Sequence, residues 1–263
     1  MRLPSLPAAL LELKNPPKEL FYEGRMCLLN SSKVAIIGTR HPNNYAKSCT
    51  KELARFFASK GVVVVSGGAL GTDMLAHDAA FPHTILISPS SFDRPYPPSH
   101  ASKIKNIAQE GLFLSEYERD FSPMRHTFLE RNRLIIALCE VVIIPQADLR
   151  SGSMQSARLA QKLGKPLYVL PHHLGESLGT QELLKEGKAS MITSFEEILE
   201  RHFPEHILGE SPSKPTGDSP NELLEFCATR PALNEALARF GEQIFEYELE
   251  GKIIIEYGRV RLA

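Results

Sequence analysis

Short runs of apolar residues recur along the first two thirds of the chain, and this repetition constrains the fold more than any other feature of the sequence. Each run is followed by a break of Gly, Ser or Pro and then by a stretch with helical periodicity. The runs are continuous rather than alternating, which is typical of parallel strands that are buried on both faces of a sheet. They occupy residues 34–37, 62–65, 84–87, 112–114, 141–144 and 167–170.

The segments between these runs have the pattern of helices that cover a sheet. Residues 45–59 place Leu53, Phe56 and Phe57 on one face, and Gly61 follows as a helix stop. Residues 153–163 end at Gly164 in the same way. Strand and helix in repeated alternation predict an α/β fold with a doubly wound, mostly parallel sheet and right-handed crossovers.

Composition divides the 263 residues into four parts. Residues 1–30 are predicted to be a short leader, with one helical segment at 6–13. Residues 31–208 hold the α/β pattern. Residues 209–220 contain no large apolar side chain and are predicted to be a linker. Residues 221–263 carry three helical patterns and two short strands, at 252–256 and 259–262, which together resemble a minimal winged helix.

The charge balance excludes one way of binding nucleic acid. Thirty Lys and Arg residues against 31 Asp and Glu residues give a formal net charge of -1. Binding through bulk positive charge is therefore excluded, whereas a local basic groove on a neutral body is not.

Nothing in the sequence predicts a membrane-spanning segment, a metal site or a bound cofactor. The first residues make a poor signal peptide, because Pro4, Pro7 and Glu12 interrupt their apolar stretch. No apolar run approaches the ~20 residues of a membrane helix. The four cysteines form no C-x-x-C pair, and isolated thiols suit a reducing cytoplasm. We therefore expect a cytoplasmic protein.

Three predicted strands end in loops of small residues. Small residues let backbone N–H groups approach an anion, and the start of a helix adds a favourable dipole. Because the carboxyl ends of parallel strands meet at one edge of a sheet, the three loops predict a row of phosphate sites; a single loop of this kind is equally well explained as a tight turn. Their residues are Gly38, Thr39 and Arg40; Ser66, Gly67, Gly68, Ala69, Gly71 and Thr72; and Ser151, Gly152 and Ser153.

These loops do not match the standard nucleotide motifs. The chain has no G-x-x-x-x-G-K-[ST] sequence, and its first strand is followed by Gly38-Thr39-Arg40-His41-Pro42 rather than G-x-G-x-x-G. Arg40 directly follows a strand end. Its guanidinium is suited to clamp a phosphate, and its alternative role is an ion pair with a neighbouring carboxylate.

A basic segment with one aromatic residue precedes the apolar helix at residues 134–138. Arginines that follow a nucleic-acid backbone, with a ring on which a base stacks, are typical of proteins that bind single strands. The alternative is a solvated helix start with the ring in the core. The candidate residues are Arg125, Phe128, Arg131, Asn132 and Arg133.

No catalytic constellation is apparent. Asp73 and Glu116 are carboxylates near strand ends, but nothing pairs them at a readable spacing, and Asp73 is expected to cap a helix. The adjacent His172 and His173 lack a third ligand for a metal, and the serines of the loops lack a base partner. The sequence therefore predicts no catalytic residue and a protein that is not an enzyme.

Several separated motifs between residues 33 and 200 together resemble the DprA/Smf family of DNA-processing proteins. They are residues 34–40 (VAIIGTR), 65–73 (VSGGALGTD) with His77, 96–98 (YPP), 114–117 (LSEY), Phe128 with 131–133 (RNR), and 150–153 (RSGS). The resemblance implies an extended Rossmann-like domain that binds single-stranded DNA and dimerises. It also implies protection of incoming DNA in natural transformation and help in loading the RecA recombinase.

The sequence departs from the family pattern at a few positions. Leu70 replaces a usual Arg in the Gly-rich loop, and Leu129-Glu130 stands where Pro-Arg is common. The main alternative is a Rossmann-like nucleotide-processing enzyme similar to phosphoribohydrolases. Its P-G-G-x-G-T-x-x-E pattern is absent, since residues 145–148 read PQAD. A third possibility is a nucleotide-sensing adaptor with the small C-terminal domain as its output.

Overall fold

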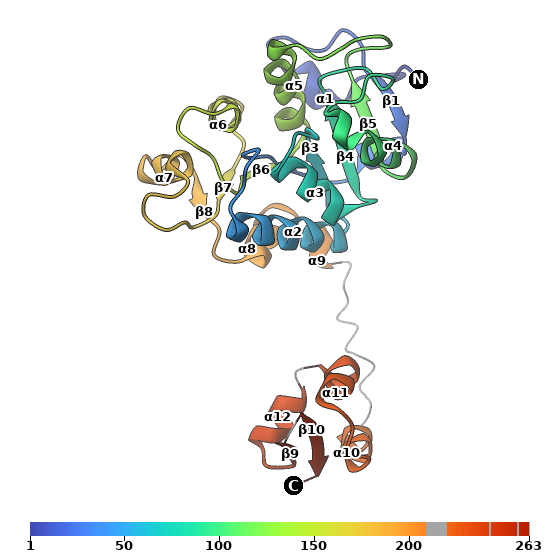
Figure 1. Cartoon of the computed structure of the whole chain (residues 1–263), viewed down its shortest axis with the longest axis vertical. Helices are drawn as coiled ribbons and strands as arrows, with labels where there is room; N and C mark the ends of the chain where they lie inside the picture. The colour runs from blue at the N-terminus through green and yellow to red at the C-terminus, as the bar shows by residue number, and fades with distance from the viewer. Residues whose placement is uncertain (209–219, 242, 257, 263) are drawn as a thin grey trace. The chain divides into compact units, whose positions relative to one another are not determined.

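The computed structural model describes residues 1–208, 220–241, 243–256 and 258–262, and the chain divides into two compact units, Met1–Ile207 and Leu208–Ala263. The first unit is an α/β domain built on one sheet, and the second is a small helical domain with a hairpin (Figure 1). This confirms the predicted fold class. The predicted linker, residues 209–220, lies outside the described residues except for Pro220.

The sheet of the first unit has the strand order β1-β5-β4-β3-β2-β6-β7-β8 within the described residues. β1 pairs antiparallel with β5, and every other neighbouring pair in this sheet is parallel. The six apolar runs all form strands, and the two edge strands β1 and β8 are additions to the prediction. The bounds are β1 Phe21–Gly24, β2 Lys33–Ile36, β3 Val63–Ser66, β4 Thr84–Ser88, β5 Leu112–Ser115, β6 Val141–Ile144, β7 Leu167–Val169 and β8 Ser190–Met191.

The direction of winding reverses beside β2. The chain adds β3, β4 and β5 on one side of β2 and then returns to place β6 on its other side. The loops after β2 and β6 therefore diverge to opposite faces of the sheet. A crevice at the carboxyl ends of such strands is where open α/β sheets bind ligands.

Helices cover both faces of the sheet because its strands are apolar on both sides. Val34 and Ile36 of β2 pack in one cluster with α2, α3 and α8, whereas Ala35 packs with α1, α5, α6 and α7 on the other face. Asn43 caps the long helix α2, its Oδ1 accepting from the Ala46 N–H at 2.8 Å. The helix bounds are α1 Ala8–Leu11, η1 Met26–Asn30, α2 Asn44–Ser59, α3 Thr72–Ala80, η2 Pro98–His100, α4 Ala101–Glu110, α5 Arg125–Leu138, α6 Gly152–Lys162, α7 Leu178–Lys185, α8 Phe195–His202 and α9 Glu205–Leu208.

The first thirty residues are part of the domain core, which corrects the idea of a separate leader. They supply β1, and Leu3, Leu10, Leu13 and Leu20 are buried in the cluster beneath α5 and α6. The spacing of these leucines is irregular, so neither helical nor strand periodicity marks them as core in the sequence.

The second unit has the three helices and the hairpin that the sequence predicts. Leu223, Phe240, Ile244, Ile253 and Val260 meet in its own small core. Its elements are α10 Pro220–Ala228, α11 Leu233–Phe240, α12 Gln243–Leu249, β9 Ile253–Glu256 and β10 Arg259–Leu262, with the two strands antiparallel. Across the described parts of the chain, no helix is long and apolar enough to span a membrane.

Neighbouring leucines of α1 test whether the first residues belong to the core. Leu10 is fully buried and Leu11 is 58% exposed. Leu10→Ala should lower the free energy of unfolding of residues 1–208 by about 2–5 kcal/mol because it leaves a cavity. Leu11→Ala should change it by less than about 0.5 kcal/mol. Urea unfolding followed by circular dichroism measures both, and equal small effects would show that the segment is detached.

Candidate nucleic-acid interface

A cavity of about 640 Å³ lies at the carboxyl ends of β2 and β6, where the winding reverses. We call it the switch-point cavity. It brings together the first and third predicted loops and most of the basic segment, which lie far apart in the sequence. Its lining includes Gly38, Thr39, Arg40, Ala69, Tyr96, Arg125, Phe128, Arg131, Asn132, Arg150, Ser151, Gly152 and Ser153.

The loops after β2 and β3 are locked to each other, which fixes the floor of the cavity. The Thr72 N–H and the Thr72 Oγ1–H both donate to the carbonyl of Thr39, at 3.2 and 3.0 Å. A Cβ on Gly38 would lie 2.7 Å from Thr72 Oγ1, and one on Gly71, whose φ is +78°, would strike the Arg40 carbonyl. Only glycine fits at these two positions, so the glycines serve loop packing that holds Arg40 in place.

The second predicted loop is closed from beneath by a side chain. Arg131 is only 4% exposed, and its guanidinium donates to the carbonyls of Gly67 and Ile87. Ser66 and Gly68 are buried as well, and Ser66 Oγ donates to the Ile36 carbonyl at 2.6 Å. The prediction of an open anion site at residues 66–68 is therefore wrong, because these residues are buried and the Asp73 carboxylate already accepts from the Ala69 N–H of this loop.

A buried charge network surrounds Arg131. The Ala69 N–H donates to the Asp73 carboxylate at 3.4 Å. Burial raises the pKa of Asp73, against the lowering effect of the Arg131 charge. Burial lowers the pKa of Arg131 to about 10, which still leaves it charged at neutral pH. Burial, and then the Arg131 charge, lower the pKa of His77 to about 3, so this ring is neutral.

Arg133 does not reach the switch-point cavity, contrary to the prediction. Its Nη1 and Nη2 donate to the two carboxylate oxygens of Glu116 at 2.8 and 2.6 Å, and its Nε donates to the Asn15 carbonyl at 2.9 Å. The hydrogen bonds from Glu116 raise the pKa of Arg133. Arg133 thus ties the N-terminal segment and β5 to α5. Residues 131 and 133 lie two apart on a helix, so they point to different sides.

The exposed cations of the cavity share it with one half-buried ring, Phe128. Arg40 and Arg125 are exposed, and the Cζ of Arg40 lies 5.6 Å from the centre of the Phe128 ring. Tyr96 packs edge-on against Phe128 with ring centres 5.3 Å apart. No chemical feature of the sequence marks Tyr96 or Arg150 as site residues, although both fall within the family motifs and both line the cavity.

The start of α6 forms another wall of the cavity. Ser151 caps this helix, its Oγ accepting from the Met154 N–H at 3.3 Å and donating to the Asp148 carbonyl at 2.7 Å. Gly152 and Ser153 line the cavity, and the first N–H groups of a helix have no partner within it. Asn132 Nδ2 donates to Ser156 Oγ at 2.9 Å and so joins α5 to this wall.

This arrangement is chemically suited to an anionic chain that carries flat rings. Guanidinium groups and helix N–H groups bind phosphate oxygens, and Phe128 offers a face for stacking. Asp73 is the one carboxylate among the lining residues, and it is buried beside Arg131. Within the described residues, no cluster of three or more His, Cys, Asp or Glu side chains is arranged to hold a metal ion.

The fold and the cavity together define a Rossmann-like protein with a basic cavity at its switch point. Residues 2–203 match the family model of DNA recombination-mediator protein A. The chain therefore belongs to this family, the DprA/Smf family of DNA-processing proteins, as the sequence motifs predict.

Relatives in several bacteria show how much of the chain this likeness covers. Protein Smf of Escherichia coli is 32% identical over 247 residues, which are 90% of this chain and 64% of that protein. DNA processing protein DprA of Bacillus subtilis is 34% identical over 200 residues, 74% of this chain and 67% of that protein. The relatives in Mycobacterium tuberculosis are 37% identical over 178 residues. The chain spans less than half of their length, 45%.

Two solved structures share the fold. DNA processing protein A from Helicobacter pylori, solved to study its single-stranded DNA binding mode, is 53% identical with a TM-score of 0.76, covering 78% of this chain and 96% of its own. DprA from Streptococcus pneumoniae is 32% identical with a TM-score of 0.71, covering 75% of this chain and 71% of its own.

The buried arginine and an exposed one should behave differently on substitution. Arg131→Met leaves Asp73 buried without its charge partner and should lower the free energy of unfolding by about 3–5 kcal/mol. Adding Asp73→Asn should restore part of that loss, since the unpaired charge is then removed. Arg125→Ala, at an exposed position, should cost less than about 0.5 kcal/mol. Denaturant unfolding measures these free energies. Full stability of Arg131→Met would contradict a stabilising role for the buried guanidinium.

Proposed function

We propose that the chain binds single-stranded DNA in the switch-point cavity. Arg40 and Arg125 take backbone phosphates, together with the N–H groups at the start of α6, and a base stacks on Phe128. The observation that carries this proposal is that exposed arginines and a half-buried ring line one cavity, with the Arg40 guanidinium over the Phe128 ring. The Helicobacter pylori structure, 53% identical, was determined for its single-stranded DNA binding mode, which supports the same chemistry here.

Single strands should bind better than duplex, and with little dependence on base sequence. A base can stack on Phe128 only when it is free of its partner strand. The other contacts are to phosphates, which carry no sequence information. The formal net charge of -1 gives little non-specific attraction to duplex DNA.

We further propose the cellular role that the family resemblance implies. The protein would act in the cytoplasm, protect incoming DNA during natural transformation and help to load the RecA recombinase. Membership of the recombination-mediator family supports this role. A nucleotide-processing enzyme is the weaker alternative, because Asp73 is the one carboxylate that lines the cavity and it is buried.

Binding of a labelled oligonucleotide to point variants tests the site. Phe128→Ala should lose about 1–3 kcal/mol of binding free energy, the value of one base stacked on a ring. Arg40→Ala should weaken binding and make the slope of log K against log salt shallower by about 0.7, since one phosphate contact is lost. Arg55→Ala, an exposed arginine on α2 outside the cavity, is the matched control and should bind as the parent protein does.

Competition separates the proposed function from the enzyme alternative. Unlabelled single strands should displace the labelled strand, whereas duplex and free mononucleotides should do so poorly. Mononucleotides that compete as well as oligonucleotides would favour a nucleotide-processing enzyme. Unchanged affinity in both Arg40→Ala and Phe128→Ala would remove the cavity from the binding surface.

We also propose a homodimer through the first unit, as the resemblance implies. Two cavities on one strand would raise the apparent affinity through effective concentration. An exposed apolar patch around α7 suits the centre of an isologous interface. Leu174 is 98% exposed, and Leu149 and Leu178 are each 47% exposed beside it in one cavity.

Light scattering on residues 1–208 tests the dimer. This truncated chain should dimerise and still bind DNA, and Leu174→Asp should give monomers that bind long oligonucleotides more weakly, because the second cavity is lost. Leu11→Asp, on the exposed face of α1, should leave the dimer intact. A monomeric parent chain with full affinity would contradict the proposal.

A further inference from the structure

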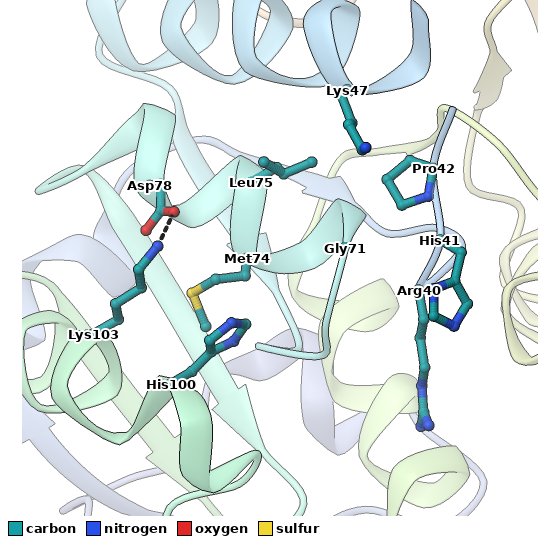
Figure 2. Close-up of a pocket in the computed structure, with 10 residues that line it drawn as sticks. All are labelled: Arg40, His41, Pro42, Lys47, Gly71, Met74, Leu75, Asp78, His100 and Lys103. Atoms are coloured by element: carbon teal, nitrogen blue, oxygen red, sulfur yellow. Dashed lines mark hydrogen bonds and ion pairs between the residues drawn. The ribbon is translucent and has the colours of Figure 1, made fainter. Parts of the chain in front are cut away.

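A second cavity, of about 360 Å³, adjoins the switch-point cavity on the far side of Arg40. Of its lining residues, only Arg40 and Gly71 belong to the set of binding residues predicted from the sequence. Arg40 and His41 line both cavities, so the two are neighbours along one surface. We call this the lysine cavity. Its lining is Arg40, His41, Pro42, Lys47, Gly71, Met74, Leu75, Asp78, His100 and Lys103 (Figure 2).

The basic side chains of the lysine cavity come from separate elements of the fold. Lys47 extends from α2, Lys103 from α4, and Arg40 from the loop after β2, with α3 between them (Figure 2). The N-terminal end of α3, which follows Gly71, lies in the same cavity and adds its positive dipole end.

The charges in the lysine cavity sum to a positive value. Arg40, Lys47 and Lys103 face Asp78, the one carboxylate of the lining, which pairs with Lys103. Among the described residues, no ion pair or hydrogen bond engages the Lys47 ammonium. Burial, and then the Lys103 charge, lower the pKa of His100, so its ring is neutral at pH 7 and adds no charge.

If these lysines were only solvated surface residues, they would not differ in position from the other exposed lysines of the same helices. Lys51 on α2 and Lys105 on α4 are also exposed, yet neither lines a cavity described above. Lys47 and Lys103 instead converge, from either side of α3, on a hollow that continues the switch-point cavity. An ammonium group is a compact charge with no preference for a base, which suits contact with a strand's backbone.

We propose that the bound single strand continues past Arg40, and that its next phosphates bind to Lys47 and Lys103 in the lysine cavity. This inference rests on the proposed function. Arg40 then lies at the junction of two successive subsites. The switch-point cavity holds a base and its phosphates, whereas the lysine cavity holds the backbone alone.

A length series of oligothymidylates tests the path. Lys47→Ala and Lys103→Ala should leave the affinity for the shortest bound oligonucleotides unchanged. Beyond a threshold length each should weaken binding about fivefold at 0.1 M salt, since one lost contact changes the salt slope by about 0.7. Lys51→Ala and Lys105→Ala are matched controls on the same helices and should have no effect at any length.

A substitution that should strengthen binding distinguishes a charge effect from a loss of structure. Asp78→Asn removes the one carboxylate of the lysine cavity and releases Lys103. It should raise the affinity for long oligonucleotides and leave that for short ones unchanged. All these positions are exposed, and matching thermal unfolding of the variants confirms that each is folded.

The outcomes separate this inference from the proposed function. If Arg125→Ala and Phe128→Ala weaken binding but the lysine variants match their controls at every length, the strand does not enter the lysine cavity. The same conclusion follows if the lysine variants weaken short and long oligonucleotides equally. If Arg125→Ala and Phe128→Ala also have no effect, the proposed function fails and the extension fails with it.

Discussion

A single buried guanidinium holds the base of the site together. Arg131 reaches from α5 to the carbonyls that follow β3 and end β4, and Asp73 at the start of α3 balances its charge. Burying a charge is costly unless it is paired and hydrogen-bonded. This network therefore holds two helices, α5 and α3, together with the ends of β3 and β4 and the Gly-rich loop. Thr72 then holds the Thr39 carbonyl, and the position of Arg40 depends on that contact.

The exposed side chains of the switch-point cavity are attached to this rigid network. Arg40, Arg125 and Arg150 are exposed, and Phe128 is half-buried between Arg40 and Tyr96. A strand that binds here meets side chains whose attachment points are already fixed. The backbone then needs little ordering on binding, whereas each exposed arginine that binds still loses rotamer freedom. Buried Arg131 thus supports the cavity from within the fold, whereas the exposed arginines form its surface.

The sequence predicted most of the sheet and about half of the contact surface, and the failures have physical causes. Continuous apolar runs identify buried strands, but β8 has two exposed residues and β1 lies at the edge, so neither has that pattern. The arginines at 131 and 133 look equivalent in a basic segment. Their roles diverge because the helix turns one toward the strand ends and the other toward Glu116. Such a division depends on partners distant in sequence, which local spacing does not reveal.

The antiparallel pairing of β1 with β5 gives the N-terminal segment a protective role. β5 is entirely buried and carries the apolar sequence LFL before Ser115. Without β1 its outer side would present unpaired N–H and C=O groups along an apolar strand, which is a template for pairing with another chain. At the opposite edge β8 is only two residues long, too short to offer such a template. The first residues of the chain thus cover the edge of β5, and Arg2 pairs in turn with Phe21 of β1.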